Sequence, residues 1–286
     1  MSPIAPTTSS GIPTGVQIRV MRRDNHPAGF TSCGHLAWRR SEGPDGSPVL
    51  EIVHPFTREE ISDNVMVSSL VGLVQAGVLA GQWEFEEAAV AMISSSATTE
   101  ESAWAAFYDN SLRELRSGIA QFGPVHRRAL SLIDGPSMLE VGCCFGFLAL
   151  QCAEDGHEVA ACDISPGAIH LLTHAARRRG TALRAVVANA LDLPFATDSV
   201  DTVTLIHLVE HLSPADITIA LREALRVARR RVVVAVPFEE HPSEHFGHLV
   251  RLTEADLNDW AATVTHAGAR IFTDHGGWLV LTPLAS

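Results

Sequence analysis

A short apolar segment followed at once by a glycine-bearing turn constrains the fold of this chain more than any other feature. Residues 137–141 have the composition of a buried strand, and Gly142 and Gly146 lie in the turn that opens the next helix. A second apolar run ends in Asp163, about 20 residues further on. Glycine lets backbone approach a ligand closely, and an acid at this spacing can accept hydrogen bonds from ribose hydroxyls. We therefore expect a doubly wound sheet that binds an adenosine-containing cofactor.

The composition excludes several classes of function. The 286 residues carry a formal net charge of −12, which argues against a nucleic acid as partner because phosphates need a basic surface. All 21 cationic side chains are Arg, so Schiff-base chemistry and Lys-dependent phosphate loops are excluded. No apolar run is long enough to span a bilayer. The odd number of cysteines, five, favours reduced thiols. We expect a cytoplasmic protein without a membrane partner.

The pattern along the chain predicts a leader and two domains. Residues 1–15 are rich in Ser, Thr, Pro and Gly, and are typical of a disordered leader rather than a signal peptide. Residues 16–97 predict a small α+β module. Its strands are expected near 16–21, 35–38 and 50–53. Residues 57–60 have the sequence of a capping box and predict a helix from there to about residue 79.

Residues 98–286 predict the larger domain, because helical and strand patterns alternate there. Five β/α units indicate a parallel sheet with helices on both faces. The last two strand patterns, 270–273 and 278–281, flank a Gly-Gly turn and predict an antiparallel hairpin. The clusters Arg177–Arg179 and Arg229–Arg231 are expected at helix C-termini, where they would compensate the helix dipole.

The glycine turn does not fit a nicotinamide site. That motif needs three glycines, and Cys144 and Phe147 occupy two of the required positions. The remaining pattern, Glu140, Gly142 and Gly146, resembles the first motif of class I S-adenosylmethionine-dependent methyltransferases. Further segments resemble that family's adenine loop and the region around its fourth strand: 189–195, 199–203 and 209–212.

This resemblance implies a Rossmann-like, doubly wound, seven-stranded sheet that binds S-adenosylmethionine. It implies that the cofactor site contains Tyr108, Glu140, Gly142, Cys144, Gly146, Asp163, Ile164, Asn189, Ala190 and Leu191. Tyr108 would either lie over the cofactor or serve helix packing. The family usually has Gly at position 144 and often Asp at position 189. We therefore expect weaker cofactor binding here, because Asn189 lacks the charge that strengthens a hydrogen bond.

The Gly-Cys-Cys-Phe-Gly turn, together with the small N-terminal module, also resembles the mycofactocin oligosaccharide methyltransferases. That closer resemblance implies O-methylation of a hydroxyl on a glycan or a glycosylated small molecule. A small-molecule C- or N-methyltransferase, and a binding protein without catalysis, stay open as alternatives. The sequence does not determine the oligomeric state.

Two histidine-rich clusters follow the predicted fourth and fifth strands of the sheet. Residues 207–211 have the His-x-x-Glu-His spacing of some zinc peptidases, but Ser213 and Pro214 restart the chain too soon for the long helix needed. The same segment resembles that of some ubiquinone-pathway O-methyltransferases, which use a divalent metal there. We favour structural hydrogen bonding of His211 under the sheet edge and leave a metal open.

The second cluster, 238–248, holds three His and three Glu in a loop at the edge where such folds bind ligands. It predicts acceptor binding or deprotonation, with a solvated acidic loop as the alternative. A histidine that titrates near neutral pH suits removal of a hydroxyl proton. We predict His245 or His207 as the catalytic base, with Glu240 as an orienting group or alternative base.

Overall fold

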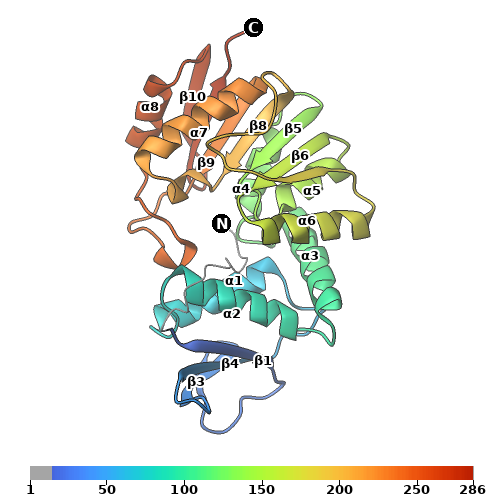
Figure 1. The fold of residues 1–286 in the computed structure, drawn as a ribbon, viewed down its shortest axis with the longest axis vertical. Coiled ribbons are helices and arrows are strands. Elements are labelled where there is room, and N and C mark those ends of the chain that lie inside the picture. The colour runs from blue at the N-terminus through green and yellow to red at the C-terminus, as the bar shows by residue number, and fades with distance from the viewer. Residues whose placement is uncertain (1–14, 286) are drawn as a thin grey trace. The chain divides into compact units, whose positions relative to one another are not determined.

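A computed structural model describes residues 15–285, which fall into two units divided after Gln121 (Figure 1). The predicted leader therefore lies outside the described residues, apart from its last residue. The sequence placed the boundary after residue 97, and the difference is helix α3 (Glu100–Ser117). The Asn110 side chain donates to the carbonyl of Ile61 at 2.7 Å, and Ser62 Oγ donates to the Glu114 carboxylate at 2.9 Å. These buried contacts attach α3 to the N-terminal unit.

The N-terminal unit is a four-stranded sheet with three helices. The sheet has the order β1 (Gln17–Arg22), β4 (Pro48–His54), β3 (Leu36–Glu42), β2 (Thr31–Cys33), and β1 runs parallel to β4. Six of the seven residues of β4 are buried, as a central strand requires. Helix α2 (Gly81–Ser95) contacts β1, and α1 (Asp63–Gln75) contacts α2.

Helix α1 begins later than the sequence suggested. Thr57 and Glu60 do hydrogen-bond to each other, through the Thr57 amide at 2.9 Å and its hydroxyl at 3.0 Å. The pair closes a turn, however, and the helix is capped by Ser62, which accepts from the Val65 amide. A reciprocal side-chain pair stabilises a turn as well as a helix start.

The C-terminal unit confirms the predicted fold class, a Rossmann-like α/β sheet of seven strands (Figure 1). The strand order is β10 (Gly268–Thr273), β11 (Gly277–Thr282), β9 (Ala228–Val236), β8 (Val200–Ile206), β5 (Ser137–Val141), β6 (Glu158–Asp163), β7 (Arg184–Val187). Strand β11 runs antiparallel to both of its neighbours, β9 and β10, and it forms the predicted terminal hairpin with β10. Strands β5 and β8 are buried along their whole length, as expected for strands covered on both faces.

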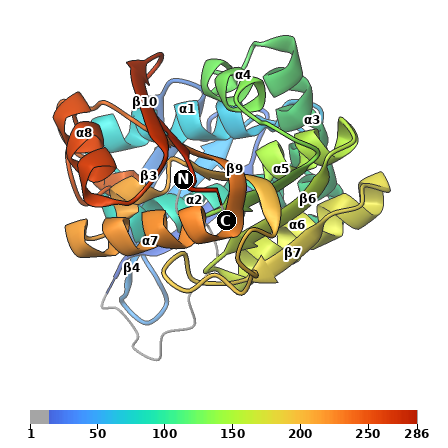
Figure 2. The ribbon, with the colours of Figure 1, turned by 90° about the horizontal axis from the view of Figure 1, so that it is seen from above.

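Helices cover both faces of this sheet (Figure 2). Helices α4 (Gly123–Ser131) and α5 (Phe147–Glu154) lie on the opposite face from α7 (Pro214–Val227) and α8 (Glu254–Thr263). Helix α6 (Pro166–Arg179) joins β6 to β7. Ser165 caps its first turn, and Gly180 follows its last turn with a φ of 68°. None of the described helices is long and apolar enough to cross a membrane.

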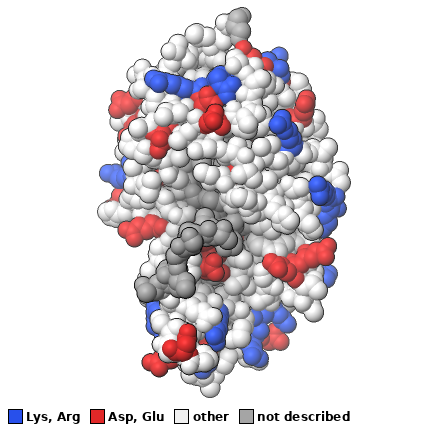
Figure 3. Space-filling view, in the orientation of Figure 1, with Lys and Arg blue, Asp and Glu red and all other residues white. Residues whose placement is uncertain are grey.

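The prediction that Arg229–Arg231 lie at a helix C-terminus is wrong, because these arginines are the second to fourth residues of strand β9. Arg229 pairs with Asp201 at 3.0 Å, and Arg231 pairs with Asp134 at 3.1 Å. Acidic partners on neighbouring segments therefore replace the helix dipole as their counter-charge. Basic and acidic side chains are interspersed over the described part of the face in Figure 3.

Candidate functional site

The carboxyl ends of β5, β6, β7 and β8 meet at one edge of the larger sheet, and the loops that follow them enclose a cavity of about 200 Å³. This is the edge at which open α/β sheets bind ligands. The cavity is lined by Val141, Gly142, Asp163, Ile164, Ala188, Asn189, Ala190, Leu208, His211 and Leu212. The lining therefore includes five of the predicted cofactor residues: Gly142, Asp163, Ile164, Asn189 and Ala190.

The turn after β5 has the backbone conformation that its glycines predict. Gly142 has a φ of 71°, and its amide donates to the Cys162 carbonyl at 2.8 Å. A Cβ at this position would lie 2.6 Å from the Leu208 side chain. Cys144, which replaces the family's usual glycine, has a φ of 48°, which is strained for a residue with a Cβ. The chain accepts this strain because buried contacts fix the turn.

Asp163 supplies the most important of these contacts. Its side chain is buried, with 4 % of the residue exposed. One carboxylate oxygen accepts from the Cys144 amide at 2.8 Å, and the other accepts from the Ser165 amide at 2.9 Å. Burial raises the pKa of this carboxyl, and the two backbone hydrogen bonds oppose that rise. Each oxygen keeps a second lone pair, so the carboxylate can also accept from a ribose diol.

The expected adenine side of the cavity is formed by loops after β6 and β7. Ile164 is 62 % exposed although its side chain is large and apolar, which suits contact with a flat apolar ligand. The Asn189 side-chain oxygen Oδ1 accepts from the Leu191 amide at 3.0 Å, within its own loop. Ala190 lines the cavity, whereas Leu191 does not.

The other predicted cofactor residues do not line this cavity. Glu140 is buried behind the turn, where it accepts from the Ala149 amide at 2.9 Å and so holds the start of α5. Cys144 and Gly146 belong to the turn itself. Tyr108 is buried in the N-terminal unit, so its cofactor role stays a prediction.

The burial of Glu140 predicts that stability falls as the pH rises from about 4.5 to about 8. Burial raises the pKa of this carboxyl from 4.5 to about 8, so folding favours its protonated form. The unfolded chain releases this proton at lower pH than the folded chain, and the free energy of unfolding therefore decreases with pH until the folded carboxyl ionises. The buried His126, whose pKa is lowered to about 4, has the opposite effect, but only below its ordinary value of 6.5.

Between about pH 6.5 and pH 8 we expect the protein to lose roughly 2 kcal/mol of stability. Chemical denaturation across this range measures the loss. In Glu140→Gln the loss should become markedly smaller, while in Glu158→Gln, an exposed carboxyl at the start of β6, it should persist. An equal slope in Glu140→Gln and the wild type would contradict the assignment.

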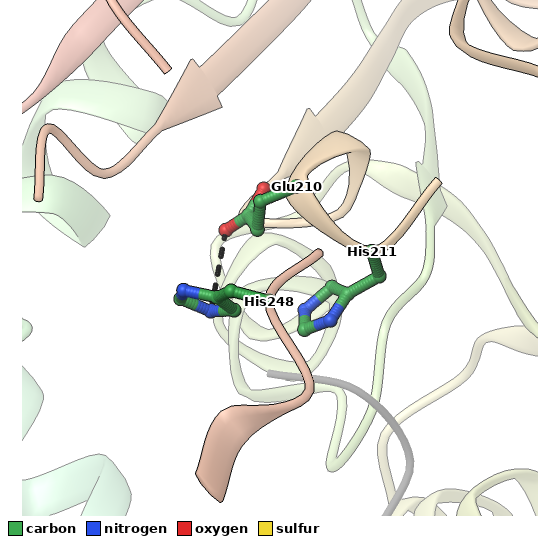
Figure 4. A group of neighbouring side chains, drawn as sticks. All are labelled: Glu210, His211 and His248. Carbon is green, nitrogen blue, oxygen red and sulfur yellow. Dashed lines mark ion pairs between the residues drawn. The ribbon is translucent and has the colours of Figure 1, made fainter. Parts of the chain in front are cut away.

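A second group of side chains meets at the ends of β8 and β9 (Figure 4). Glu210 and His211 belong to the short helix η1 (Val209–His211), and His248 follows η2 (Glu244–Phe246). His248 Nδ1 lies 2.7 Å from the Glu239 carboxylate, and His211 Nδ1 lies 3.1 Å from the Gly247 carbonyl. Burial raises the pKa of Glu210 to about 7 and lowers that of His211 to about 3. The predicted hydrogen bonding of His211 is thus present through one ring nitrogen.

The three predicted catalytic residues lie near this group in sequence but differ in environment. His207 has a φ of 52° and lies 3.3 Å from Glu210, and burial lowers its pKa well below the ordinary value. His245 is half-buried beside Phe246, and burial also lowers its pKa. Glu240 is exposed, and its neighbour Glu239 is the residue that contacts a histidine. Glu239 and His248 were not predicted, because nothing in the sequence of the loop distinguishes them from its other Glu and His residues.

Comparisons with known proteins agree with this geometry over part of the chain. Residues 139–236 match the methyltransferase domain family. A demethylmenaquinone methyltransferase of Beutenbergia cavernae is 36 % identical over 109 residues, which cover 37 % of this chain and 43 % of that protein. An uncharacterized protein of Mycobacterium tuberculosis H37Rv is 32 % identical over 111 residues, covering 39 % of this chain and 40 % of that protein.

Among solved structures, the PH0226 protein from Pyrococcus horikoshii OT3 has a TM-score of 0.49 and 18 % identity, covering 60 % of this chain and 92 % of that one. The aligned segments span less than half the length of the two curated relatives. The match to the methyltransferase domain family includes the turn after β5, on which the resemblance to class I methyltransferases rests.

Proposed function

We propose that the protein is an S-adenosylmethionine-dependent O-methyltransferase that acts on a hydroxyl of a glycan or a glycosylated small molecule. The single observation that carries the cofactor assignment is the buried Asp163 carboxylate, held by two backbone amides at the rim of the cavity. The match of residues 139–236 to the methyltransferase domain family supports it independently.

The residues of the cavity fit this cofactor. Asp163 offers lone pairs for the ribose hydroxyls, and Gly142 has no side chain between the backbone and a ligand. Ile164 and Ala190 provide apolar surface for the adenine ring. When bound, S-adenosylmethionine supplies a methyl group on a sulfonium, which an oxygen takes by in-line displacement. The chain therefore has to position the acceptor and remove its proton.

The choice of oxygen as acceptor rests on the histidines at this edge. A sugar or alcohol hydroxyl is a poor nucleophile until a base takes its proton. Burial lowers the pKa of both His207 and His245, so each is neutral near pH 7 and has a nitrogen able to accept a proton. We propose one of them as the base, with Glu240 as an orienting group or alternative base. The glycan assignment rests on the resemblance of the Gly142–Gly146 turn described above.

A second candidate is a small-molecule C- or N-methyltransferase. The similarity to a demethylmenaquinone methyltransferase of Beutenbergia cavernae favours a small non-glycan acceptor. A third is a protein that binds the cofactor without catalysis. These candidates differ in the atom that receives the methyl group, or in whether any atom does.

The deciding experiment incubates the purified protein with methyl-labelled S-adenosylmethionine and fractionated cell extract, and identifies the labelled product by mass spectrometry. We expect label on an oxygen of a glycan-containing product. The rate of methyl transfer should fall when both His207 and His245 are replaced by Ala. Label on carbon or nitrogen would support the second candidate, and cofactor binding without labelled product would support the third.

A further inference from the structure

We propose that Glu210, His211 and His248 bind a divalent transition-metal ion beside the cofactor cavity (Figure 4). Each residue offers one ligand atom, and the three atoms lie within 4.8 Å of one another. The residues come from two loops that follow adjacent parallel strands, β8 and β9. The fold itself therefore brings them together.

The carboxylate of Glu210 is the observation that most needs a partner. Only 1 % of the residue is exposed, and neither carboxylate oxygen has a hydrogen-bond partner among the described residues. Its near neighbours are imidazoles, His207 Nδ1 at 3.3 Å and His248 Nε2 at 3.9 Å. A buried carboxylate is costly unless it is paired or coordinates a metal. A cation held between Glu210 and these rings would supply the missing charge.

The two ligand histidines are oriented as metal ligands usually are. Glu239 accepts a hydrogen bond from Nδ1 of His248, and the Gly247 carbonyl accepts one from Nδ1 of His211. Because each acceptor requires the proton on Nδ1, Nε2 of both rings is left with its lone pair. Metal-bound histidines almost always donate their other ring nitrogen to a carboxylate or a carbonyl in this way.

A purely structural hydrogen-bond network explains less. It accounts for the two Nδ1 contacts, but it leaves the Glu210 oxygens and the buried Nε2 of His211 without hydrogen bonds among the described residues. These unpaired atoms belong to two of the three proposed ligands, Glu210 and His211.

The donor set indicates the class of ion. Two imidazole nitrogens and one carboxylate oxygen suit Zn²⁺, Co²⁺, Mn²⁺ or Fe²⁺ better than Ca²⁺, which prefers oxygen ligands. Three protein ligands leave coordination positions open for an exogenous group. His211 also lines the cofactor cavity. The next step rests on the proposed function. We infer that a hydroxyl of the acceptor occupies an open coordination position, where the ion lowers the pKa of that hydroxyl before the methyl group is transferred.

The test is titration of the untagged, chelator-treated protein with CoCl₂, followed by the visible absorption of protein-bound Co²⁺. We expect one ion per chain with ligand-field bands of a nitrogen- and oxygen-bound site. Glu210→Gln, His211→Gln and His248→Gln should each weaken binding by at least about tenfold, and Glu239→Gln by about 10- to 100-fold, since it orients His248. His241→Gln, an exposed histidine of the same loop, is the matched control and should bind as the wild type does.

Circular dichroism of each metal-free variant shows which ones fold, and His211→Gln, at a partly exposed position, is the variant most tolerant of change. Absence of Co²⁺ binding to the wild type would overturn the proposal. So would equal affinity in the wild type and in the folded ligand variants. Calorimetry with S-adenosylhomocysteine on the same samples tests the cofactor site separately, so failure of the metal site leaves that result intact.

Discussion

Replacing Asp163 by Asn is expected to weaken binding of S-adenosylhomocysteine by about a hundredfold or more. The amide has nearly the shape of the carboxylate but only one oxygen and no charge. Two backbone amides, of Cys144 and Ser165, already use both carboxylate oxygens, and the ribose hydroxyls need acceptors as well. The variant therefore loses charge-assisted hydrogen bonds to the ligand and presents an NH₂ group to a backbone N–H. Isothermal titration calorimetry measures the affinity.

The same substitution should lower the free energy of unfolding by about 1–3 kcal/mol, because one buried amide loses its acceptor. Asp155→Asn is the matched control: this exposed carboxyl follows α5 in the same domain, and its loss should change neither quantity. If Asp163→Asn folds and binds the ligand as tightly as the wild type, the cofactor does not lie where we place it.

The larger domain could be predicted from the sequence because local and global signals agree there. Strand β9 ends in a continuous apolar run, 232–236, which is typical of parallel strands covered on both faces. Ser165, Pro166 and Gly180 define both ends of α6 through backbone chemistry that needs no tertiary contact. The final hairpin follows from its Gly-Gly turn.

The predictions that differ from the structure concern features that tertiary contacts determine. Helix α3 was assigned to the larger domain because its sequence carries no sign of the partners that it contacts, such as the carbonyl of Ile61. Arg229–Arg231 were placed at a helix end because their acidic partners, Asp134 and Asp201, are distant in sequence. Charge alone predicts a need for compensation but not its source.

In the candidate site, too, local sequence signals predicted one part and tertiary contacts decide the other. The position of Gly142 and Asp163 at one cavity was predictable, because a glycine turn and an acid at fixed spacing follow from the strand–turn–helix geometry itself. The acidic and histidine-rich loop 238–248 has no such periodicity, so sequence could not distinguish Glu239 from Glu240, or His248 from His245. The structure distinguishes them by the 2.7 Å contact between Glu239 and His248.

Replacing Gly142 by Val is expected to abolish measurable binding of S-adenosylhomocysteine and to destabilise the protein by about 2–5 kcal/mol. Two costs add. A β-branched residue at a φ of 71° is strained, and its Cβ would lie 2.6 Å from Leu208. Leu208 lines the cavity, so a displaced side chain would fill space that the cofactor needs. Calorimetry and chemical denaturation measure the two effects.

Gly156 separates these costs, because its φ of 94° is also positive but nothing lies within 4 Å of a Cβ added there. Gly156→Val should therefore show the backbone cost alone and keep cofactor binding. Adding Leu208→Ala to Gly142→Val should recover part of the lost stability, namely the part due to the contact, and leave the backbone strain in place. If the double variant is no more stable than Gly142→Val, backbone strain alone limits position 142. If Gly142→Val still binds the ligand, the turn after β5 does not approach it closely.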